Sequence, residues 1–271
     1  MTFGCLPAKV DLRDYKMTVG AIQLPEEFEC AEYASRIKNQ KSVQSCVAHS
    51  ISTILEHHSK NEYPLSTNFI YGIQNQEFGR THEGMYLADA CRIARKYGDM
   101  FERDCTGNTE VPNCYKTAED ALADTEKAGR AYNFRIKAYM SCRTDTHIKK
   151  ALYTYGPVLA SIKWYDTCYV DVNYNLKYLN DSSYGLHAIV IYGWTKEGWL
   201  CQNSWGTAWG NHGRFILPFD YGIEEARGIV DVENEINLDE IVIPKNNKFL
   251  DVIYKIINWI INFINNKRRK K

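Results

Sequence analysis

The chain has 271 residues, 45% of them hydrophobic and 24% charged, so it can bury a sizeable core and is neither disordered nor collagenous in composition. Lys and Arg together number 33, as do Asp and Glu, so the formal net charge is zero. Residues 245–271 nevertheless carry eight Lys or Arg and one Asp; because this basic excess lies in a tail and not in a folded groove, we expect no nucleic-acid partner.

The N-terminal segment, residues 1–23, has no strong periodicity and is predicted to be an extension. It contains no apolar h-region, so we expect an intracellular protein, in a host or bacterial cytoplasm, or a virion-associated one. Nine cysteines would suit an oxidising compartment, but the missing signal favours reduced thiols. Cys105 and Cys114 flank a turn-like segment, and they either bridge across it or remain buried thiols.

Three segments in the first 160 residues have helical features. The first begins after Ser45, a suitable N-cap. Its apolar face carries Val47, Ile51, Ile54, Leu55 and His58. The second runs from Met85 to Tyr97 and ends at Gly98, and the third occupies residues 146–155 before Gly156-Pro157.

Short β-branched and aromatic runs dominate the second half of the chain. We expect strands at residues 157–164, 187–194, 199–203 and 213–217, with a hairpin loop at residues 195–198. Because helices come first and strands follow, the order favours an α+β protein with two lobes over alternating βαβ units.

Three residues are candidates for chemistry on local grounds. Cys46 begins a predicted helix, where free N–H groups and the helix dipole favour a thiolate, although a structural cysteine is the alternative. His187 opens an apolar strand, and on local grounds alone a satisfied core histidine is the better interpretation. Asn203 ends the next strand before a segment, residues 204–210, with two Trp and two Gly. Aromatic bulk there would keep water away from a hydrogen-bonded Asn–His pair.

Three segments resemble those of the papain family of cysteine peptidases. The sequence RIKNQ at residues 36–40, followed by Ser45-Cys46, resembles the segment that joins an oxyanion-hole glutamine to the nucleophile, with the family's spacing of six residues. His187-Ala188 and the sequence QNSWGTAWG at residues 202–210 resemble the family's histidine and asparagine segments. His187 and Asn203 lie 141 and 157 residues after Cys46.

The resemblance covers roughly residues 24–231 and implies a papain-like two-lobe fold. A helical N-terminal lobe and an antiparallel, β-barrel-like C-terminal lobe would enclose the catalytic cleft. It also implies a thiol endopeptidase that cleaves a polypeptide substrate through an acyl-enzyme, without a metal or cofactor.

The resemblance also implies a role for each motif residue. Cys46 would be the nucleophile, held as a thiolate by the imidazolium of His187, which then acts as acid and base. Asn203 would orient the imidazole, and Gln40 would stabilise the oxyanion together with the Cys46 backbone N–H.

Other positions correspond to the walls of the family's cleft. The expected substrate-binding residues are Glu83, Gly84, Met85, Ser161, Leu186, Ala188 and Trp205. The chain departs from many relatives at Val47, which replaces an aromatic residue, and at Val43, which replaces a disulfide cysteine. These departures favour a bacterial, phage or viral type, and His49 is expected to be a packing or surface residue.

The sequence divides into four regions. Residues 1–23 form the extension, whose Asp-x-Arg-Asp element at residues 11–14 resembles that of bacterial and viral relatives; it either covers the cleft or belts the surface. The peptidase domain spans residues 24–232 and a linker spans residues 233–247. Residues 248–271 are predicted to form a basic amphipathic helix.

The tail admits three interpretations. Residues 249–264 would form a helix about 24 Å long, short of the ~30 Å hydrocarbon core, with one narrow polar stripe. Residues 249–271 therefore fit three descriptions: an interfacial helix on an anionic membrane surface, a helix docked on a partner or on the protein itself, or a short tail anchor.

Two alternative functions remain. The same triad serves peptidoglycan peptide hydrolases, although the sequence contains no visible wall-binding repeat. A catalytically silent papain-like binding or structural protein is the other alternative. The presence of Gln40, Cys46, His187 and Asn203 argues against it.

Overall fold

The computed structural model describes residues 3–8, 15–16, 22–30, 36–60, 62–107, 109–180 and 183–231. These residues belong to one compact unit, residues 1–234. The Asp-x-Arg-Asp element, the linker and the basic tail lie outside the described residues, so the expectations for them stay predictions. Within the described part of the chain, no helix is long and apolar enough to cross a membrane.

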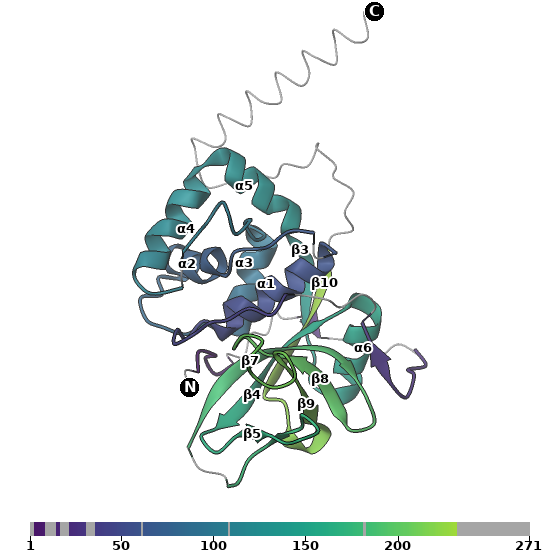
Figure 1. The fold of residues 1–271 in the computed structure, drawn as a ribbon. Coiled ribbons are helices and arrows are strands. Elements are labelled where there is room, and N and C mark those ends of the chain that lie inside the picture. The colour runs from purple at the N-terminus through teal and green to yellow at the C-terminus, as the bar shows by residue number, and fades with distance from the viewer. Residues whose placement is uncertain are drawn as a thin grey trace, which may run out of the picture. The chain divides into compact units, whose positions relative to one another are not determined.

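Helices α1–α5 pack together as one half of this unit, called here the helical half (Figure 1). Their bounds are Cys46–His58 for α1, Thr67–Phe78 for α2, Leu87–Lys96 for α3, Asn113–Ala123 for α4 and Thr125–Ala131 for α5. A further helix, α6 at Asp145–Tyr155, packs against strands of the other half. Helices α1, α3 and α6 confirm the three predicted helices.

Local hydrogen bonds explain the helices that periodicity missed. The hydroxyl of Ser66 accepts from the Phe69 N–H at the start of α2, and Asp124 accepts from two backbone amides at the start of α5. Ser45 occupies the N-cap position of α1 as predicted, but its side chain does not cap the helix. Its hydroxyl instead accepts a hydrogen bond from Thr109, 2.7 Å away.

The strands form the second half, called here the sheet half. They are β1 at Tyr15–Lys16, β2 at Phe28–Glu29, β3 at Ile136–Ser141, β4 at Val158–Tyr165, β5 at Tyr169–Val170, β6 at Leu176–Lys177, β7 at Tyr184–Trp194, β8 at Gly198–Gln202, β9 at Arg214–Pro218 and β10 at Glu225–Asp231. The main sheet has the order β1-β3-β10-β4-β7-β8-β9, with β2 pairing on β7. Its neighbours are antiparallel except β1 and β3.

This arrangement confirms the predicted α+β, two-lobe fold and its strand-rich second half. The path of described strands does not return to its starting edge, so the sheet is open and not a closed barrel. The predicted hairpin loop is present, since the Thr195 N–H donates to the Gly198 carbonyl at 2.9 Å.

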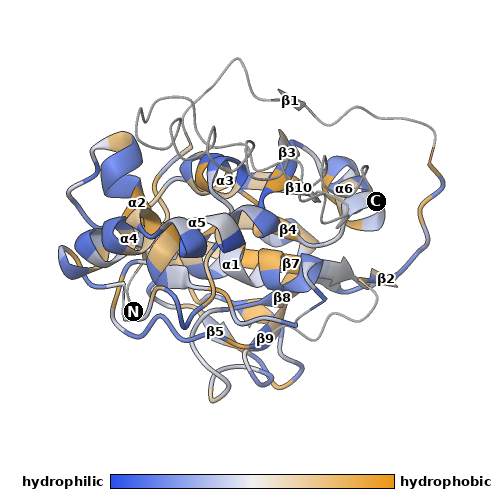
Figure 2. Cartoon of the chain, turned by 90° about the horizontal axis from the view of Figure 1, so that it is seen from above, coloured by the Kyte–Doolittle hydropathy of each residue, from blue (hydrophilic) through white to orange (hydrophobic). Residues whose placement is uncertain are grey.

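The halves meet where α1 packs against β7. Figure 2 shows the hydrophobic colouring of β7 beside α1. Nearly all of α1 is buried, including its polar positions His49, Ser52 and Glu56. A helix buried on every side needs internal partners for its polar groups.

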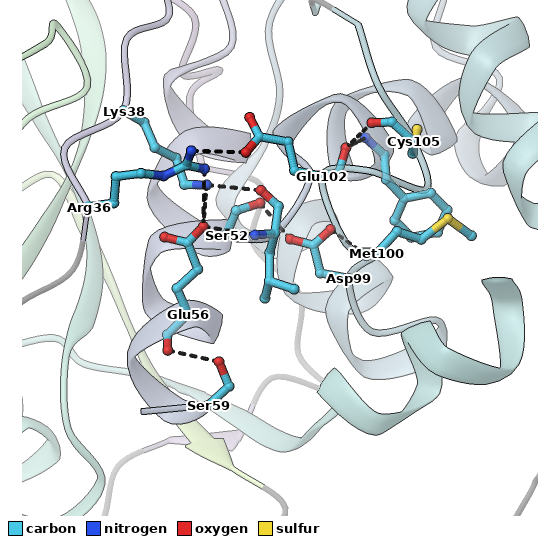
Figure 3. A network of polar contacts seen from close by, with 12 residues as sticks. Arg36, Lys38, Ser52, Glu56, Ser59, Asp99, Met100, Glu102 and Cys105 are labelled. Carbon is cyan, nitrogen blue, oxygen red and sulfur yellow. Dashed lines mark hydrogen bonds and ion pairs between the residues drawn. The ribbon is translucent and has the colours of Figure 1, made fainter. Parts of the chain in front are cut away.

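Those partners form a network in the helical half (Figure 3). The Lys38 ammonium donates to Glu56 Oε1 at 2.7 Å and to the Leu65 carbonyl at 3.0 Å. The Leu65 N–H donates to the same carboxylate oxygen at 2.8 Å. A second link joins Ser52 to Asp99 at 2.7 Å. Because Lys38 precedes Gln40 by two residues, the network anchors the chain that leads into the predicted oxyanion hole.

Candidate active site

The sheet topology exposes one edge of β7 to the helical half. Strand β8 pairs with β7 only as far as the Val190–Gln202 partners, and the chain then turns away at Asn203. The edge of β7 at Leu186–Ala188 is therefore open on this side. Cys46 docks there, since the Ala188 N–H donates to Cys46 Sγ at 3.4 Å. The ends of α1 and β8 thus bring Cys46, His187 and Asn203 to one place.

His187 and Asn203 form the predicted pair. The distance between His187 Nε2 and Asn203 Oδ1 is 2.8 Å, and both residues are buried. Because the amide oxygen accepts, Nε2 carries the proton and the neutral imidazole keeps its lone pair on Nδ1. Among the described residues Nδ1 has no hydrogen-bond partner. The lone pair on Nδ1 is therefore available to accept a proton.

Aromatic rings surround this imidazole. The ring of Trp205 lies 4.8 Å from that of His187, and the ring of Trp164 lies 5.2 Å away, edge to face. Trp209 contacts both tryptophans. These rings exclude water from the His187–Asn203 bond, as the sequence around Trp205 led us to expect. Trp164 was predicted only as a strand residue, because nothing in its local sequence distinguishes it from core.

Gln40 is tied to the same loop through Ser204. The Gln40 N–H donates to the Ser204 carbonyl at 2.8 Å, and the Ser204 hydroxyl donates to Gln40 Oε1 at 2.6 Å. The Ser204 N–H also donates to Asn203 Oδ1 at 2.7 Å. With its oxygen held, the Gln40 amide nitrogen turns the other way and donates to the Val43 carbonyl at 2.9 Å. Ser204 thereby links the oxyanion-hole candidate to the His–Asn pair, a role that the sequence analysis missed.

The N-terminal residues 3–8 lie in the cleft. The Cys5 N–H donates to the Leu186 carbonyl at 3.2 Å on the sheet side. On the helical side the Leu6 N–H donates to the Met85 carbonyl at 2.9 Å, and the Met85 N–H donates to the Gly4 carbonyl at 2.8 Å. This is a parallel bridge between Cys5 and Met85. The predicted cleft-wall residues Met85 and Leu186 therefore bind backbone, here the protein's own.

A family model described as papain family cysteine protease matches residues 24–227. The chain belongs to this family. Cathepsin B-like cysteine proteinase 3 of Caenorhabditis elegans is 26% identical over 227 residues, 72% of this chain and 61% of that protein. Cathepsin B-like cysteine proteinase 1 of Haemonchus contortus is 28% identical over 167 residues, 56% of this chain and 48% of that protein. The chain thus spans about half to three fifths of these relatives.

Solved structures support the fold. Xylellain, a cysteine protease from Xylella fastidiosa, superposes with a TM-score of 0.71 at 21% identity, covering 85% of this chain and 96% of that one. Procathepsin B S9 from Trypanosoma congolense gives a TM-score of 0.62 at 18% identity, covering 83% and 84%. The curated relatives named above come from nematodes, so the expected bacterial, phage or viral type stays a prediction.

The pKa shifts of Cys46 and His187 oppose the formation of the expected ion pair. Burial raises the pKa of the Cys46 thiol to about 11, although backbone N–H groups, including those of Ala188 and Gly4, act in the opposite direction. Burial also lowers the pKa of His187 to about 4, against the hydrogen bond to Asn203. Burial with residues 3–8 in the cleft thus favours the neutral thiol and the neutral imidazole, and the expected resting thiolate–imidazolium pair stays a prediction.

The other predicted cleft residues occupy distinct positions. Ser161 and Ala188 are register partners on β4 and β7. Gly84 is buried with a φ of 92°, and its N–H donates to the Tyr71 hydroxyl at 2.8 Å. Glu83, next to it, is exposed. It is therefore available to solvent at the rim of this wall.

Two further predictions concern the Cys105–Cys114 disulfide and His49. Cys105 and Cys114 are free thiols, as are the chain's seven other cysteines. The suggested bridge is therefore absent. His49 is buried, and its Nδ1 lies 2.9 Å from the Ser45 carbonyl oxygen within its own helix. It is a packing residue, as expected.

Proposed function

We propose that the chain is a thiol endopeptidase that hydrolyses polypeptides through Cys46, His187 and Asn203. The observation that supports this most is the 2.8 Å contact between His187 Nε2 and Asn203 Oδ1. It fixes the proton on Nε2 and leaves Nδ1 of a buried imidazole as the base. Cys46 contacts the next residue of the same strand, Ala188, at 3.4 Å.

The reaction starts with transfer of the Cys46 proton to His187 Nδ1. The thiolate attacks the carbonyl carbon of the substrate, a C–S bond forms, and the carbonyl oxygen becomes an oxyanion. The Cys46 N–H and the Gln40 side-chain amide donate to this oxygen. One such donor typically contributes on the order of 10²–10³ in rate. The Ser204 hydroxyl supports Gln40 in this role by holding its Oε1.

His187 then gives its proton to the leaving amine as the C–N bond breaks. In the second half of the reaction His187 takes a proton from water, which attacks the thioester and releases Cys46. The neutral state of both groups in the closed cleft has a consequence for this cycle. The ion pair forms when residues 3–8 leave and solvent or substrate replaces them.

An epoxide-type thiol-peptidase probe tests the proposal on the reduced full chain. We expect covalent labelling of the wild type and none of Cys46→Ala. Cys201→Ala is the matched control, because Cys201 is equally buried but lies in β8 away from the cleft. Its labelling should equal that of the wild type.

Absence of labelling that depends on Cys46 would contradict the proposal and favour a silent binding protein. Cleavage of peptidoglycan peptides, with no cleavage of a polypeptide library, would favour the alternative hydrolase. The basic tail, residues 249–271, supports a separate proposal of attachment to an anionic membrane surface, drawn from the sequence. Liposome flotation of the full chain against a version ending at Glu240 tests it.

A further inference from the structure

Cys5 enters the cleft beside the nucleophile. Its N–H contacts the Leu186 carbonyl, and Cys46 Sγ contacts the Ala188 N–H, at 3.2 and 3.4 Å. These two strand groups belong to residues two apart on the same open edge of β7, a spacing of about 7 Å along the strand. The Gly4 N–H, directly before Cys5, also points to Cys46 Sγ. Both cysteines are buried in one apolar cluster.

The segment fits the cleft closely but does not present a substrate bond to the thiol. A β-carbon on Gly4 would lie 2.0 Å from the Gln44 carbonyl oxygen, so only glycine lets the chain pass this close. The group aimed at Cys46 Sγ is an amide N–H, whereas the Gly4 carbonyl is turned to the Met85 N–H. Without a carbonyl carbon facing the sulfur, the segment occupies the cleft without being cleaved there.

Phe3 fixes the N-terminal segment on the other side of Gly4. A β-carbon on Gly185 would lie 2.3 Å from the Phe3 ring, so the ring rests directly on the β7 backbone two residues before His187. The chain is thus fixed on both sides of Gly4, and the Cys5 thiol, hydrogen-bonded to Ser161, is held in the same cleft as Cys46. The Cys5 thiol also lies close enough for the charge of a Cys46 thiolate to raise its pKa.

We propose that Cys5 is a resolving thiol that forms a reversible disulfide with Cys46 under oxidation and so locks the N-terminal segment in the cleft. The proposal concerns regulation of the site under Proposed function and rests on Cys46 being its nucleophile. A disulfide joins residues whose Cα atoms lie about 4.4–6.8 Å apart, so its formation requires the Cys5 side chain to turn from Ser161 towards Cys46.

The chemistry balances with a peroxide as oxidant. With the segment transiently out of the cleft, the Cys46 thiolate attacks the peroxide; the O–O bond breaks, giving a sulfenic acid and an alcohol or water after protonation. When the segment returns, the Cys5 sulfur attacks the sulfenic sulfur. The S–S bond forms, the S–O bond breaks, and the hydroxyl leaves as water with the Cys5 proton. A dithiol later reduces the disulfide and restores both thiols.

This step would protect the nucleophile. A sulfenic acid that finds no thiol is open to further oxidation to sulfinic acid, which thiols do not reverse. In the closed form both thiols are protonated, because burial raises the pKa of Cys5 well above its usual range and that of Cys46 to about 11. Molecules with the N-terminal segment in the cleft therefore react slowly with peroxide, and oxidation acts on those in which the segment has left the cleft.

The test uses reduced full-length protein treated with hydrogen peroxide and analysed by intact mass and peptide mapping. We expect wild type to lose the mass of two hydrogens and to yield one cross-linked peptide pair joining Cys5 and Cys46. Cys5→Ser should form no such pair, and its Cys46 should accumulate sulfinic acid. Cys168→Ser is the control, since Cys168 is partly exposed and bonded to Tyr221 in the sheet half. It should cross-link like wild type.

After treatment with a dithiol, epoxide-probe labelling of wild type should recover at least about 5-fold better than that of Cys5→Ser, each relative to its own untreated sample. Sulfinic Cys46 in wild type without a Cys5–Cys46 peptide, or cross-links to other cysteines instead, would overturn the proposal. The mass measurement does not depend on activity, so an inactive protein that still cross-links would count against the peptidase proposal alone.

Discussion

The helical half buries paired polar groups around α1, whereas the sheet half packs aromatic rings around His187. Around α1 the buried polar groups are paired, with Lys38 on Glu56 at 2.7 Å and Ser52 on Asp99 at 2.7 Å (Figure 3). Around β7 the packing is by Trp164 and its neighbours, within 4.7–6.1 Å between ring centroids. Paired charges set the position of the segment before Gln40, while rings keep water from a hydrogen bond. The two halves therefore protect the cleft through different interactions, and mutations should distinguish the contribution of the buried polar pairs from that of the aromatic rings.

The largest effect is expected from Lys38→Met in the helical half. It leaves Glu56 buried, with a side chain only 4% exposed, and removes its 2.7 Å partner, so that the half-exposed Arg36, 3.6 Å away, is its remaining cation among the described residues. Breaking one partner of such a pair costs about 3–5 kcal/mol of unfolding free energy. Urea unfolding measures it. The double variant Lys38→Met, Glu56→Met is the control and should recover much of the loss, and equal loss in both would contradict the charge argument.

Asp99→Asn should change the pH dependence of stability. Burial raises the folded pKa of Asp99 to about 8 from its usual 3.8, so the folded protein binds the proton more tightly. The protonated Asp99 therefore contributes to the free energy of unfolding at acidic pH, and this contribution is lost as the pH rises towards 8. Buried His49, His58 and His187, with pKa values lowered to about 4, act in the opposite sense as pH falls below 6.5.

The window between pH 6.5 and 8 therefore isolates Asp99 from the histidines. Wild type should lose up to about 2 kcal/mol of unfolding free energy across it, and Asp99→Asn should lose less. Urea unfolding at both pH values measures the difference. Equal slopes for the two proteins would show that the raised pKa of Asp99 does not contribute.

In the sheet half, Trp205→Leu should reduce activity more than stability. Its ring lies 4.8 Å from that of His187, and its removal opens the His187–Asn203 bond to water. A misplaced imidazole should lower kcat/KM on the order of 10-fold to 30-fold. Trp199→Leu is the control, since Trp199 is buried against Phe219 instead. Trp199→Leu should lower the stability and leave kcat/KM per folded molecule unchanged. A larger loss of kcat/KM for Trp199→Leu than for Trp205→Leu would count against shielding.

The sequence predicted those parts of the molecule that local patterns encode. The helix after Ser45, the strand that opens near His187 and the motif around Asn203 all lie where the periodicity and spacing indicated. Ser66 and Asp124 carried cap signals for α2 and α5 that could have been used. These features depend on residues that are neighbours along the chain.

What the sequence did not predict depends on contacts across the fold. Trp164 reaches His187 only because β4 pairs with β7. The sequence left open whether the N-terminal extension covers the cleft, since the bonds of residues 3–8 go to residues about 80 and 180 positions later. The shift of both pKa values towards the neutral thiol and the neutral imidazole follows from that burial and not from the motif.

The smallest predicted effect is at the link between the two halves. Ser204→Ala removes the hydroxyl that donates to Gln40 Oε1 at 2.6 Å but keeps the backbone bond to the Gln40 N–H. One net hydrogen bond is worth about 1 kcal/mol, so kcat should fall about 5-fold with KM nearly unchanged, because the role proposed for Gln40 is to stabilise the oxyanion. Steady-state kinetics on a peptide substrate measures this.

Ser52→Ala is the matched serine in the helical half. Its hydroxyl donates to Asp99 at 2.7 Å, within the polar network, so its loss should lower unfolding free energy and leave kcat alone. A fall in kcat for Ser52→Ala as large as for Ser204→Ala would mean that the network in the helical half also sets the geometry of the oxyanion hole. The division between stabilising charges and a shielded catalytic pair would then not hold at Gln40, where the two halves meet.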